Sequence, residues 1–238
     1  IIFPETKRGK ITMESKCRYG DYVYKVLNNG TVEILSFDNK NCTEITIPEK
    51  LDGYLVSSVK NNFRGIGLRH IHVDESHPFL LDINGVLVSK KDMSLLVFPK
   101  AYPQKSFDIP NGIVSIGKSA FLSCDNLREI TMPDSVVSIG KKAFYACVKL
   151  ASVSFSNRLI HIGDCAFQQC ISLTQITLPD SVHTIGANPF CDCFKLMSII
   201  VSDEHPHLEV TGGAFIHKQE KRLITHLFSV FTDEYLIP

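Results

Sequence analysis

The stretch MPDSVVSIGKKAFYACVKLASVS, residues 132–154, contains the template that decides the fold of this chain. Four copies of the template follow one another at a constant interval, and they begin at Ile109, Met132, Phe155 and Leu178. Five residue types keep their place in every copy: Ile116, Ile139, Ile162 and Ile185; Gly117, Gly140, Gly163 and Gly186; Phe121, Phe144, Phe167 and Phe190; Cys124, Cys147, Cys170 and Cys193; Leu127, Leu150, Leu173 and Leu196. Self-similarity at one fixed period of this length indicates a solenoid in which each copy forms one coil.

Each copy combines a half-buried strand with a tight turn. Around Ile130 and Met132, apolar residues alternate with polar ones, which is the period of a strand with one buried face. Pro133 ends that strand because proline has no N–H to donate to a ladder. The apolar residues of segment 143–150 lie three and four positions apart, so the pattern predicts a short helical or 3₁₀ turn there.

The template resembles the leucine-rich repeat of the BspA-like family, also called the Treponema pallidum type, which reads roughly IP-x-S-V-x-x-I-G-x-x-A-F-x-x-C-x-x-L. The second copy carries this whole pattern within residues 132–150, with methionine at the first position. Ser156 replaces the proline in the third copy, and Pro189 replaces the alanine in the fourth. The resemblance implies a leucine-rich-repeat solenoid that is β-rich and formally α/β, with a right-handed, curved parallel sheet, short helical or 3₁₀ turns and inserted β-hairpins.

Two longer segments, 73–108 and 201–238, are related to each other by a constant offset without a gap. Several pairs keep that register: His77 and His205, Gly85 and Gly213, Lys90 and Lys218, Leu95 and Leu223, Ile109 and Ile237, Pro110 and Pro238. In the first segment apolar runs flank a polar centre, which predicts an inserted hairpin, and the shared register predicts a second hairpin insertion in the other segment. Nearer the N-terminus, Asn28-Asn29-Gly30 lies between two alternating runs and predicts another hairpin.

We therefore expect one continuous elongated domain. Its parts are an N-terminal capping hairpin with the first coil at 1–46, a degenerate repeat at 47–72 that includes Phe63, a hairpin insertion at 73–108, four regular repeats at 109–200 and a second hairpin insertion at 201–238.

The composition excludes several classes of function. The chain has 238 residues, of which 44% are hydrophobic, and its 25 acidic and 25 basic residues leave a formal net charge of zero. Without a basic run or face, nucleic-acid binding has no electrostatic basis. No apolar run approaches the roughly 18 residues that a membrane span needs. Neither a nucleophile elbow, a phosphate-binding loop nor a His-Glu-x-x-His pattern occurs, so we expect no enzyme, no catalytic residue and no cofactor.

The two ends of the sequence carry expectations of their own. The chain begins at Ile1 with no methionine or signal-peptide pattern, which favours a processed or trimmed product. Residues 234–238 reproduce the register of 106–110, where the regular repeats open. We expect further repeats beyond this point or a last strand that is covered, because a bare strand edge promotes association.

The pattern of the cysteines favours a role as buried structural thiols over disulfides or metal ligands. The four cysteines at the repeated position should form a buried column. Because neighbouring coils lie about 4.8 Å apart, the Cβ atoms of successive cysteines are farther apart than the roughly 3.5–4.5 Å between the Cβ atoms of a disulfide. Free buried cysteine behaves as a small apolar residue. Cys191 and Cys193 are too close in sequence for ordinary zinc spacing. The sequence allows two alternatives for Cys17 and Cys42: a disulfide near the cap, or two separate thiols.

Two groups of histidines attract a chemical interpretation. His70-Ile71-His72 places two imidazoles on one face of a strand, a geometry that metal ligands use. Because the pattern contains no recognisable third ligand, we expect plain surface histidines and no metal site. His77 and His205 each precede proline at the shared register, which favours a structural role in a turn.

The outward positions of the strands form the candidate binding surface. In a parallel solenoid these positions stack into rows, and here they hold Glu129, Ser152, Gln175 and Ser198 in one row and Thr131, Ser154, Thr177 and Ile200 in the other, with His70 and His72 continuing them toward the N-terminus. Such a shallow, mostly uncharged surface is suited to hydrogen bonding with an extended partner, and repeat proteins commonly bind along a concave face.

The resemblance implies a cell-surface or secreted protein of host-associated bacteria, with relatives linked to adhesion. The leading hypothesis is a noncatalytic module that binds a protein, host extracellular-matrix proteins included, or a glycan. The alternative is a structural spacer or self-assembling scaffold that associates through its C-terminal edge.

Overall fold

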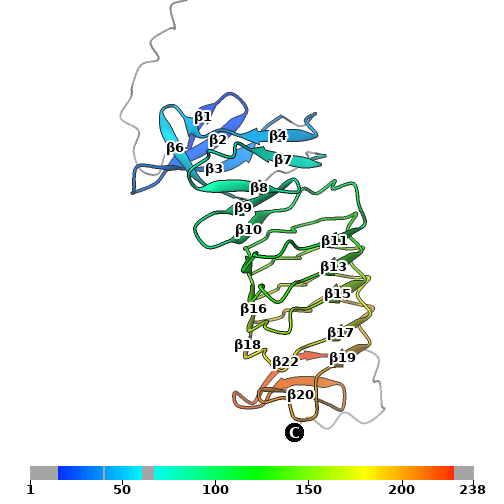
Figure 1. The fold of residues 1–238 in the computed structure, drawn as a ribbon. Coiled ribbons are helices and arrows are strands. Elements are labelled where there is room, and N and C mark those ends of the chain that lie inside the picture. Colours follow the sequence, from blue (N-terminus) through cyan, green and yellow to red (C-terminus); the bar gives the residue numbers. More distant parts are fainter. Residues whose placement is uncertain (1–15, 40, 61–66, 228–238) are drawn as a thin grey trace, which may run out of the picture.

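The computed structural model describes residues 16–39, 41–60 and 67–227, and over these ranges the chain is built from strands and turns without a helix. None of the described residues therefore belongs to a helix capable of crossing a membrane. Figure 1 shows a stack of coils with a cap of strands at the N-terminal end and a smaller sheet at the C-terminal end. Phe63, which belongs to the expected degenerate repeat, and residues 234–238, which repeat the register of 106–110, lie outside the described residues.

Two faces of parallel strands run along the stack (Figure 1). One face consists of β11 (Ser106–Asp108), β13 (Glu129–Thr131), β15 (Ser152–Ser154), β17 (Gln175–Thr177) and β19 (Ser198–Ile200). The other consists of β12 (Ser115–Ile116), β14 (Ser138–Ile139), β16 (His161–Ile162) and β18 (Thr184–Ile185). Equivalent residues of successive copies pair directly, as Ile116 does with Ile139 and Ile139 with Ile162, which confirms the period and the solenoid.

The N-terminal cap is a five-stranded sheet in the order β1-β2-β3-β6-β5. Its strands are β1 (Lys16–Tyr19), β2 (Tyr22–Val26), β3 (Val32–Phe37), β5 (Lys50–Leu51) and β6 (Tyr54–Val59). The Asn-Gly turn joins β2 to β3 as an antiparallel hairpin, as the sequence predicts. Strand β4 (Glu44–Ile47) leaves this sheet and pairs in parallel with β7 (His70–Val73).

Two related antiparallel units occupy the two segments that share a register. The first contains β8 (Leu80–Ile83), β9 (Val86–Ser89) and β10 (Ser94–Val97), and the second contains β20 (Leu208–Thr211), β21 (Ala214–His217) and β22 (Arg222–His226). The strand pairings agree, because Leu80 pairs with Ser89 and Leu208 pairs with His217. In the first unit β10 also pairs in parallel with β12, so the hairpin joins the face of the solenoid.

The prediction of a helical or 3₁₀ turn in each repeat is wrong. In the second repeat Lys142 and Ala146 have φ values of 56° and 58°, so the segment is a run of β-turns with left-handed residues. Alternate N–H groups consequently point along the stack: that of Phe144 donates to Ala166 O at 2.7 Å, whereas that of Cys147 donates within its own coil to Phe144 O at 3.2 Å. A helix directs its N–H groups along its own axis and would lose the bonds that join the coils.

Aromatic rings form a column through the core. Phe144 stacks on Phe121 with ring centroids 4.7 Å apart and on Phe167 at 4.9 Å. The column continues to Phe98 at one end and Phe190 at the other. Every ring in it is buried, so the repeated phenylalanine packs successive coils against one another in the core.

The cysteine column is confirmed as a set of thiols. All eight cysteines of the chain lie in the described part and none forms a disulfide, so Cys17 and Cys42 remain separate. In the column the thiols of Cys147, Cys170 and Cys193 each lie against a carbonyl of the preceding coil, as Cys147 Sγ does at 2.9 Å from Phe121 O. Burial raises the pKa of Cys193 to about 12, which keeps that thiol protonated at neutral pH.

His77 and His205 have the structural role that their position predicts. Both are buried, and Nδ1 of each accepts two backbone N–H groups, those of Phe79 and Leu80 for His77 and those of His207 and Leu208 for His205. Each ring thereby closes the turn into its three-stranded unit.

This arrangement predicts loss of stability in mild acid. Burial lowers the pKa of His77 and of His205 below the ordinary value of 6.5. Because the unfolded chain then binds more protons than the folded one, stability is full above about pH 6.5 and declines as the pH falls below that value. Each histidine contributes a slope of at most about 1.4 kcal/mol per pH unit.

Urea titrations between pH 7.5 and 5 should show this decline in the free energy of unfolding. The double variant His77→Asn with His205→Asn should show a flatter profile, because the asparagine amide oxygens accept the same N–H groups without titrating. An equally steep profile in that double variant would contradict the assignment.

Candidate functional site

The outward rows of the β11–β19 face are exposed as the sequence predicts. Glu129 pairs with Ser152 and Thr131 with Ser154, while Gln175 pairs with Ser198 and Thr177 with Ile200. All eight side chains reach the surface, Ser198 to a smaller extent than the others. From β13 to β19, Glu129 carries the one charge in these two rows, so the face presents hydroxyl and amide groups rather than a strong field.

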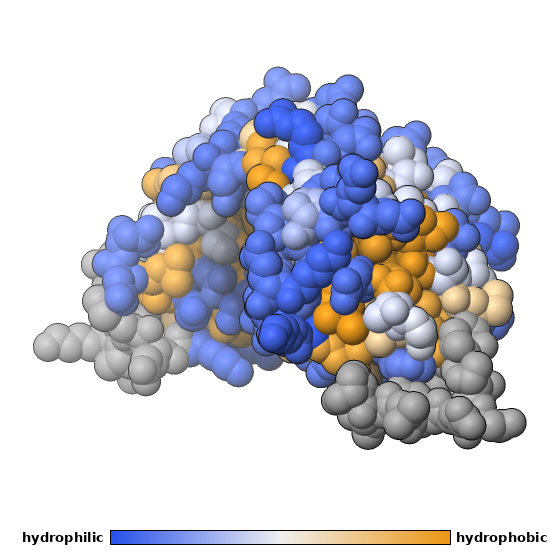
Figure 2. Space-filling model, turned by 90° about the horizontal axis from the view of Figure 1, so that it is seen from below, coloured by the Kyte–Doolittle hydropathy of each residue, from blue (hydrophilic) through white to orange (hydrophobic). Residues whose placement is uncertain are grey.

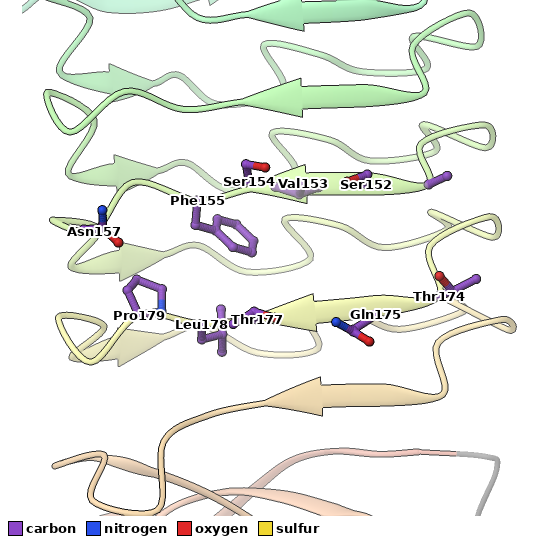
Figure 3. Close-up of a pocket in the computed structure, with 11 residues that line it drawn as sticks. Ser152, Val153, Ser154, Phe155, Asn157, Thr174, Gln175, Thr177, Leu178 and Pro179 are labelled. Carbon is purple, nitrogen blue, oxygen red and sulfur yellow. The ribbon is translucent and has the colours of Figure 1, made fainter.

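The rows are interrupted between β15 and β17. The face divides into a sheet of β11, β13 and β15 and a separate sheet of β17 and β19, and no ladder joins β15 to β17 in the described chain. Figure 3 shows β17 set farther from β15 than from β19. The N–H groups of Met132 and Leu178 each donate to the next coil at 2.9 Å, but the equivalent bond from Phe155 to Thr177 is missing. The opposite face stays continuous, so the solenoid opens on one side only.

The third copy of the template departs from the others at this opening. Phe155 stands where the other copies have Ile109, Met132 and Leu178. Its ring meets Phe167 edge to face with centroids 5.8 Å apart, so the corner of the coil must accommodate a larger side chain in addition to the core column. Ser156 also replaces the proline that follows the strand.

A depression of about 620 Å³ lies at the opening. Figure 3 shows the side chains that line it, which come from both strands and from the residues just before and after them. They are Ala151, Ser152, Val153, Ser154, Phe155, Asn157, Thr174, Gln175, Thr177, Leu178 and Pro179. Val153 and Phe155 are partly exposed here, whereas their counterparts Ile130 and Met132 are buried. The depression therefore combines an apolar floor with hydroxyl and amide groups at its rim, which suits hydrogen-bonded recognition.

His70 and His72 lie apart from these rows. Strand β7 pairs with β4 and not with β11, so the two histidines belong to a separate two-stranded sheet. Their surroundings contain a residue that sequence reasoning missed: Asp82 of β8, whose Oδ2 lies 3.2 Å from His70 Nε2. The sequence predicts no metal site here because it shows no third ligand. Asp82 supplies a third side chain of a metal-binding type, so the reason for that prediction does not hold. The direct pairing of Glu44 with His70 also brings a carboxylate from the preceding parallel strand.

The comparisons agree on the architecture. The family model of the BspA type leucine rich repeat region matches residues 93–217 in six copies, which extends the repeat beyond the four regular copies. No curated protein matches the chain. The structure of the pneumococcal vaccine antigen PcpA aligns with a TM-score of 0.61 and 26% identity, over 69% of this chain and 41% of PcpA.

Two further solved structures show the same fold. A leucine rich cell surface protein from Faecalibacterium prausnitzii A2-165 aligns with a TM-score of 0.53 and 19% identity, over 79% of this chain and 88% of that one. A leucine-rich repeat protein from Eubacterium ventriosum ATCC 27560 aligns with a TM-score of 0.54 and 23% identity, over 67% of this chain and 48% of that one. The chain thus spans less than half the length of two of these three proteins.

Proposed function

Because the chain belongs to the BspA-type leucine-rich repeat family, we propose that it is a noncatalytic binding module, secreted or displayed at the cell surface, that recognises a protein or a glycan through the β11–β19 face. The observation that carries this proposal is the depression between β15 and β17, which interrupts an otherwise regular sheet on that face alone. The similar structures include a cell surface protein and a vaccine antigen, which supports an exposed location.

The chemistry of the face indicates how a partner would be held. Ser152, Ser154 and Thr177 offer hydroxyl groups, and Gln175 offers an amide that both donates and accepts. Within the described part of the chain, the edges of strands β15 and β17 that face the opening have no ladder partner, so their backbone groups add further donors and acceptors. With so little charge on the face, binding should depend only weakly on salt concentration.

The test is a binding screen of the purified chain against extracellular-matrix proteins and glycans, with sizing across concentration beside it. We expect a saturable partner whose dissociation constant rises at least tenfold, about 1.4 kcal/mol, in Gln175→Trp, because the indole fills the depression. Glu129→Trp, two coils away on the same rows, should weaken a partner that spans the face.

Ile160→Trp provides the matched control. Ile160 is 47% exposed and precedes β16 on the opposite face of the third copy. It receives the same bulky residue, and its binding should remain that of the unchanged protein. A partner that Ile160→Trp removes and Gln175→Trp leaves would place recognition on the other face and contradict the proposal.

A structural or self-assembling role is the second candidate. Figure 2, which views the C-terminal end, shows apolar side chains gathered beside hydrophilic ones. In the last regular copy and after it, several large apolar residues are exposed: Phe194 at 67%, Met197 at 62%, Ile200 at 43% and Leu223 at 57%. A screen without any partner, together with oligomers that grow with concentration and are reduced by Phe194→Ser, would favour this role.

A further inference from the structure

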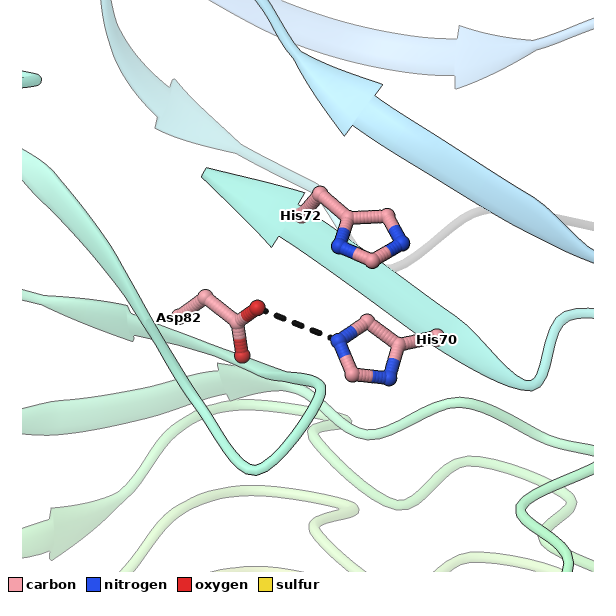
Figure 4. Close-up of side chains that lie close together, drawn as sticks. All are labelled: His70, His72 and Asp82. Carbon is pink, nitrogen blue, oxygen red and sulfur yellow. Dashed lines mark hydrogen bonds and ion pairs between the residues drawn. The ribbon is translucent and has the colours of Figure 1, made fainter. Parts of the chain in front are cut away.

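A cluster of possible metal ligands lies between the cap and the solenoid, away from the depression. His70 and His72 alternate on β7, so their rings project from the same side and stack with centroids 4.2 Å apart. Asp82 approaches from β8, and Figure 4 shows its carboxylate facing the two rings. One ligand atom from each of the three residues lies within 4.8 Å of the others.

The carboxylate of Asp82 is held in a fixed orientation. Its Oδ1 accepts the N–H of Gly85 at 2.6 Å, which leaves Oδ2 facing His70 Nε2 at 3.2 Å. The turn itself is anchored, because the carbonyl of Gly85 accepts the N–H of Ile71 at 3.0 Å. A Cβ at position 85 would lie 2.6 Å from His70 Nδ1, so only glycine lets the turn pack against the ring. The backbone therefore positions two of the three side chains before any ion arrives.

A fourth donor lies beside the cluster. Glu44 Oε2 is 3.2 Å from His72 Nε2. Among the described residues, neither Asp82 nor Glu44 makes an ion pair with lysine or arginine, so both negative charges remain available. Two carboxylates would balance the charge of a divalent cation, while the neutral imidazoles supply nitrogen ligands.

The fold does not require these side chains. In the register that relates the two hairpin segments, Ser198, Ile200 and Val210 stand in place of His70, His72 and Asp82. The same two segments keep the residues that shape the unit, among them the buried His77 and His205 and the turn residues Gly85 and Gly213. The ligand-type residues are thus an addition to one copy of a unit that folds without them in the other.

We propose that His70, His72 and Asp82 form a binding site for a divalent transition metal, with zinc as the ion that this donor set fits best. Two imidazoles and a carboxylate, with one coordination position open, are a common ligand set for zinc. Ligand bonds of about 2.0–2.2 Å place tetrahedral donors roughly 3.3–3.6 Å apart. The His70–Asp82 distance already matches, and small rotations of exposed side chains bring His72 into range.

The open position gives the site a further use. His72 is exposed, and its side chain retains 46% of its accessible surface, so the fourth ligand can come from Glu44, from water or from a donor group on a bound partner. The ion would also join β7 to the inserted hairpin β8–β9, and thereby fasten the insertion to the two-stranded sheet. Metal binding should therefore raise the unfolding temperature by several degrees as well as occupy the site.

Calorimetric titration of the chelator-treated protein with zinc chloride tests the proposal, with cobalt(II) as a spectroscopic probe. We expect one equivalent of zinc bound at micromolar or lower dissociation constant, and cobalt absorption typical of a tetrahedral site with nitrogen and oxygen ligands. The double substitution of His70→Ser with His72→Ile installs the residues of the other copy, so it should fold. It should weaken zinc at least a hundredfold and abolish the thermal shift. Asp82→Asn, which keeps the shape of the side chain, should weaken zinc at least tenfold.

Two controls separate this site from other donors. His161→Ser removes an exposed histidine on β16 and should leave the affinity unchanged. A near-ultraviolet thiolate-to-cobalt band, or an equivalent of zinc that survives in the double variant, would assign the ion to cysteines or to other histidines. Either result, like the absence of zinc binding in the unchanged protein, would overturn the proposal.

Discussion

Replacing Phe144 by alanine is expected to lower the free energy of unfolding by about 3–5 kcal/mol. Phe144 is fully buried and stacks on rings both above and below it, at 4.7 and 4.9 Å between centroids. Removing it takes apolar area out of the core and also leaves a cavity that neither neighbour can fill, because Phe121 and Phe167 are fixed by their own coils. The loss should appear as a fall in melting temperature of roughly 6–20 °C, since 1 kcal/mol corresponds to about 2–4 °C in a chain of this size.

The position of Phe144 adds a second expected effect. In a solenoid each coil contacts only its neighbours, so a weak interface in the middle separates the stack into two parts. Urea unfolding followed by circular dichroism should therefore broaden in Phe144→Ala. Phe194→Ala is the matched control, because Phe194 is 67% exposed and its loss should change stability by less than about 0.5 kcal/mol. Equal losses in the two variants would contradict the account of the column.

The period of the sequence is sufficient to predict most of the fold. Apart from the break between β15 and β17, the strand residues of the regular repeats have their ladder partners at the same position of the next copy, so the repeat places Glu129 beside Ser152 and Ile116 beside Ile139 without further information. The turns were mispredicted because apolar spacings of three and four suit a helix and a run of β-turns equally well. The left-handed φ values at non-glycine residues such as Lys142 leave no mark in the hydrophobic pattern.

The candidate sites depended on features outside the repeat pattern. The opening between β15 and β17 coincides with two departures from the template, Phe155 and Ser156, and the sequence shows these substitutions but not that the strands separate beside them. Asp82 follows His72 at a distance along the chain, in a hairpin whose packing direction only the structure gives. In both cases the site depends on a contact that the repeat period does not predict, namely that of Phe155 with Phe167 and that of Asp82 with His70.

Replacing Gly163 by alanine is the second change with a large expected effect. A Cβ at this position would lie 2.6 Å from the N atom and 3.0 Å from the Cα atom of Lys141, and 2.7 Å from the carbonyl carbon of Gly140. These are backbone atoms of the preceding coil, so no side chain can rotate away, and the two coils must move apart. Overpacking of this kind costs about 1–3 kcal/mol, and the shift also weakens the bond from Gly163 N to Ile139 O, now 2.8 Å, for about 1 kcal/mol more. We expect a total loss of about 3 kcal/mol.

Gly67→Ala separates this steric effect from the general effect of replacing glycine. No described atom lies within 4 Å of a Cβ built on Gly67, and neither glycine has a positive φ. Alanine restricts the unfolded chain at both positions, which alone stabilises the protein by about 0.4–1 kcal/mol. Urea titrations of the two variants should therefore give changes of opposite sign. A Gly163→Ala protein as stable as the unchanged one would mean that the coils are not in backbone contact at the repeated glycine, and that the repeat keeps this residue for a reason other than the close approach of successive coils.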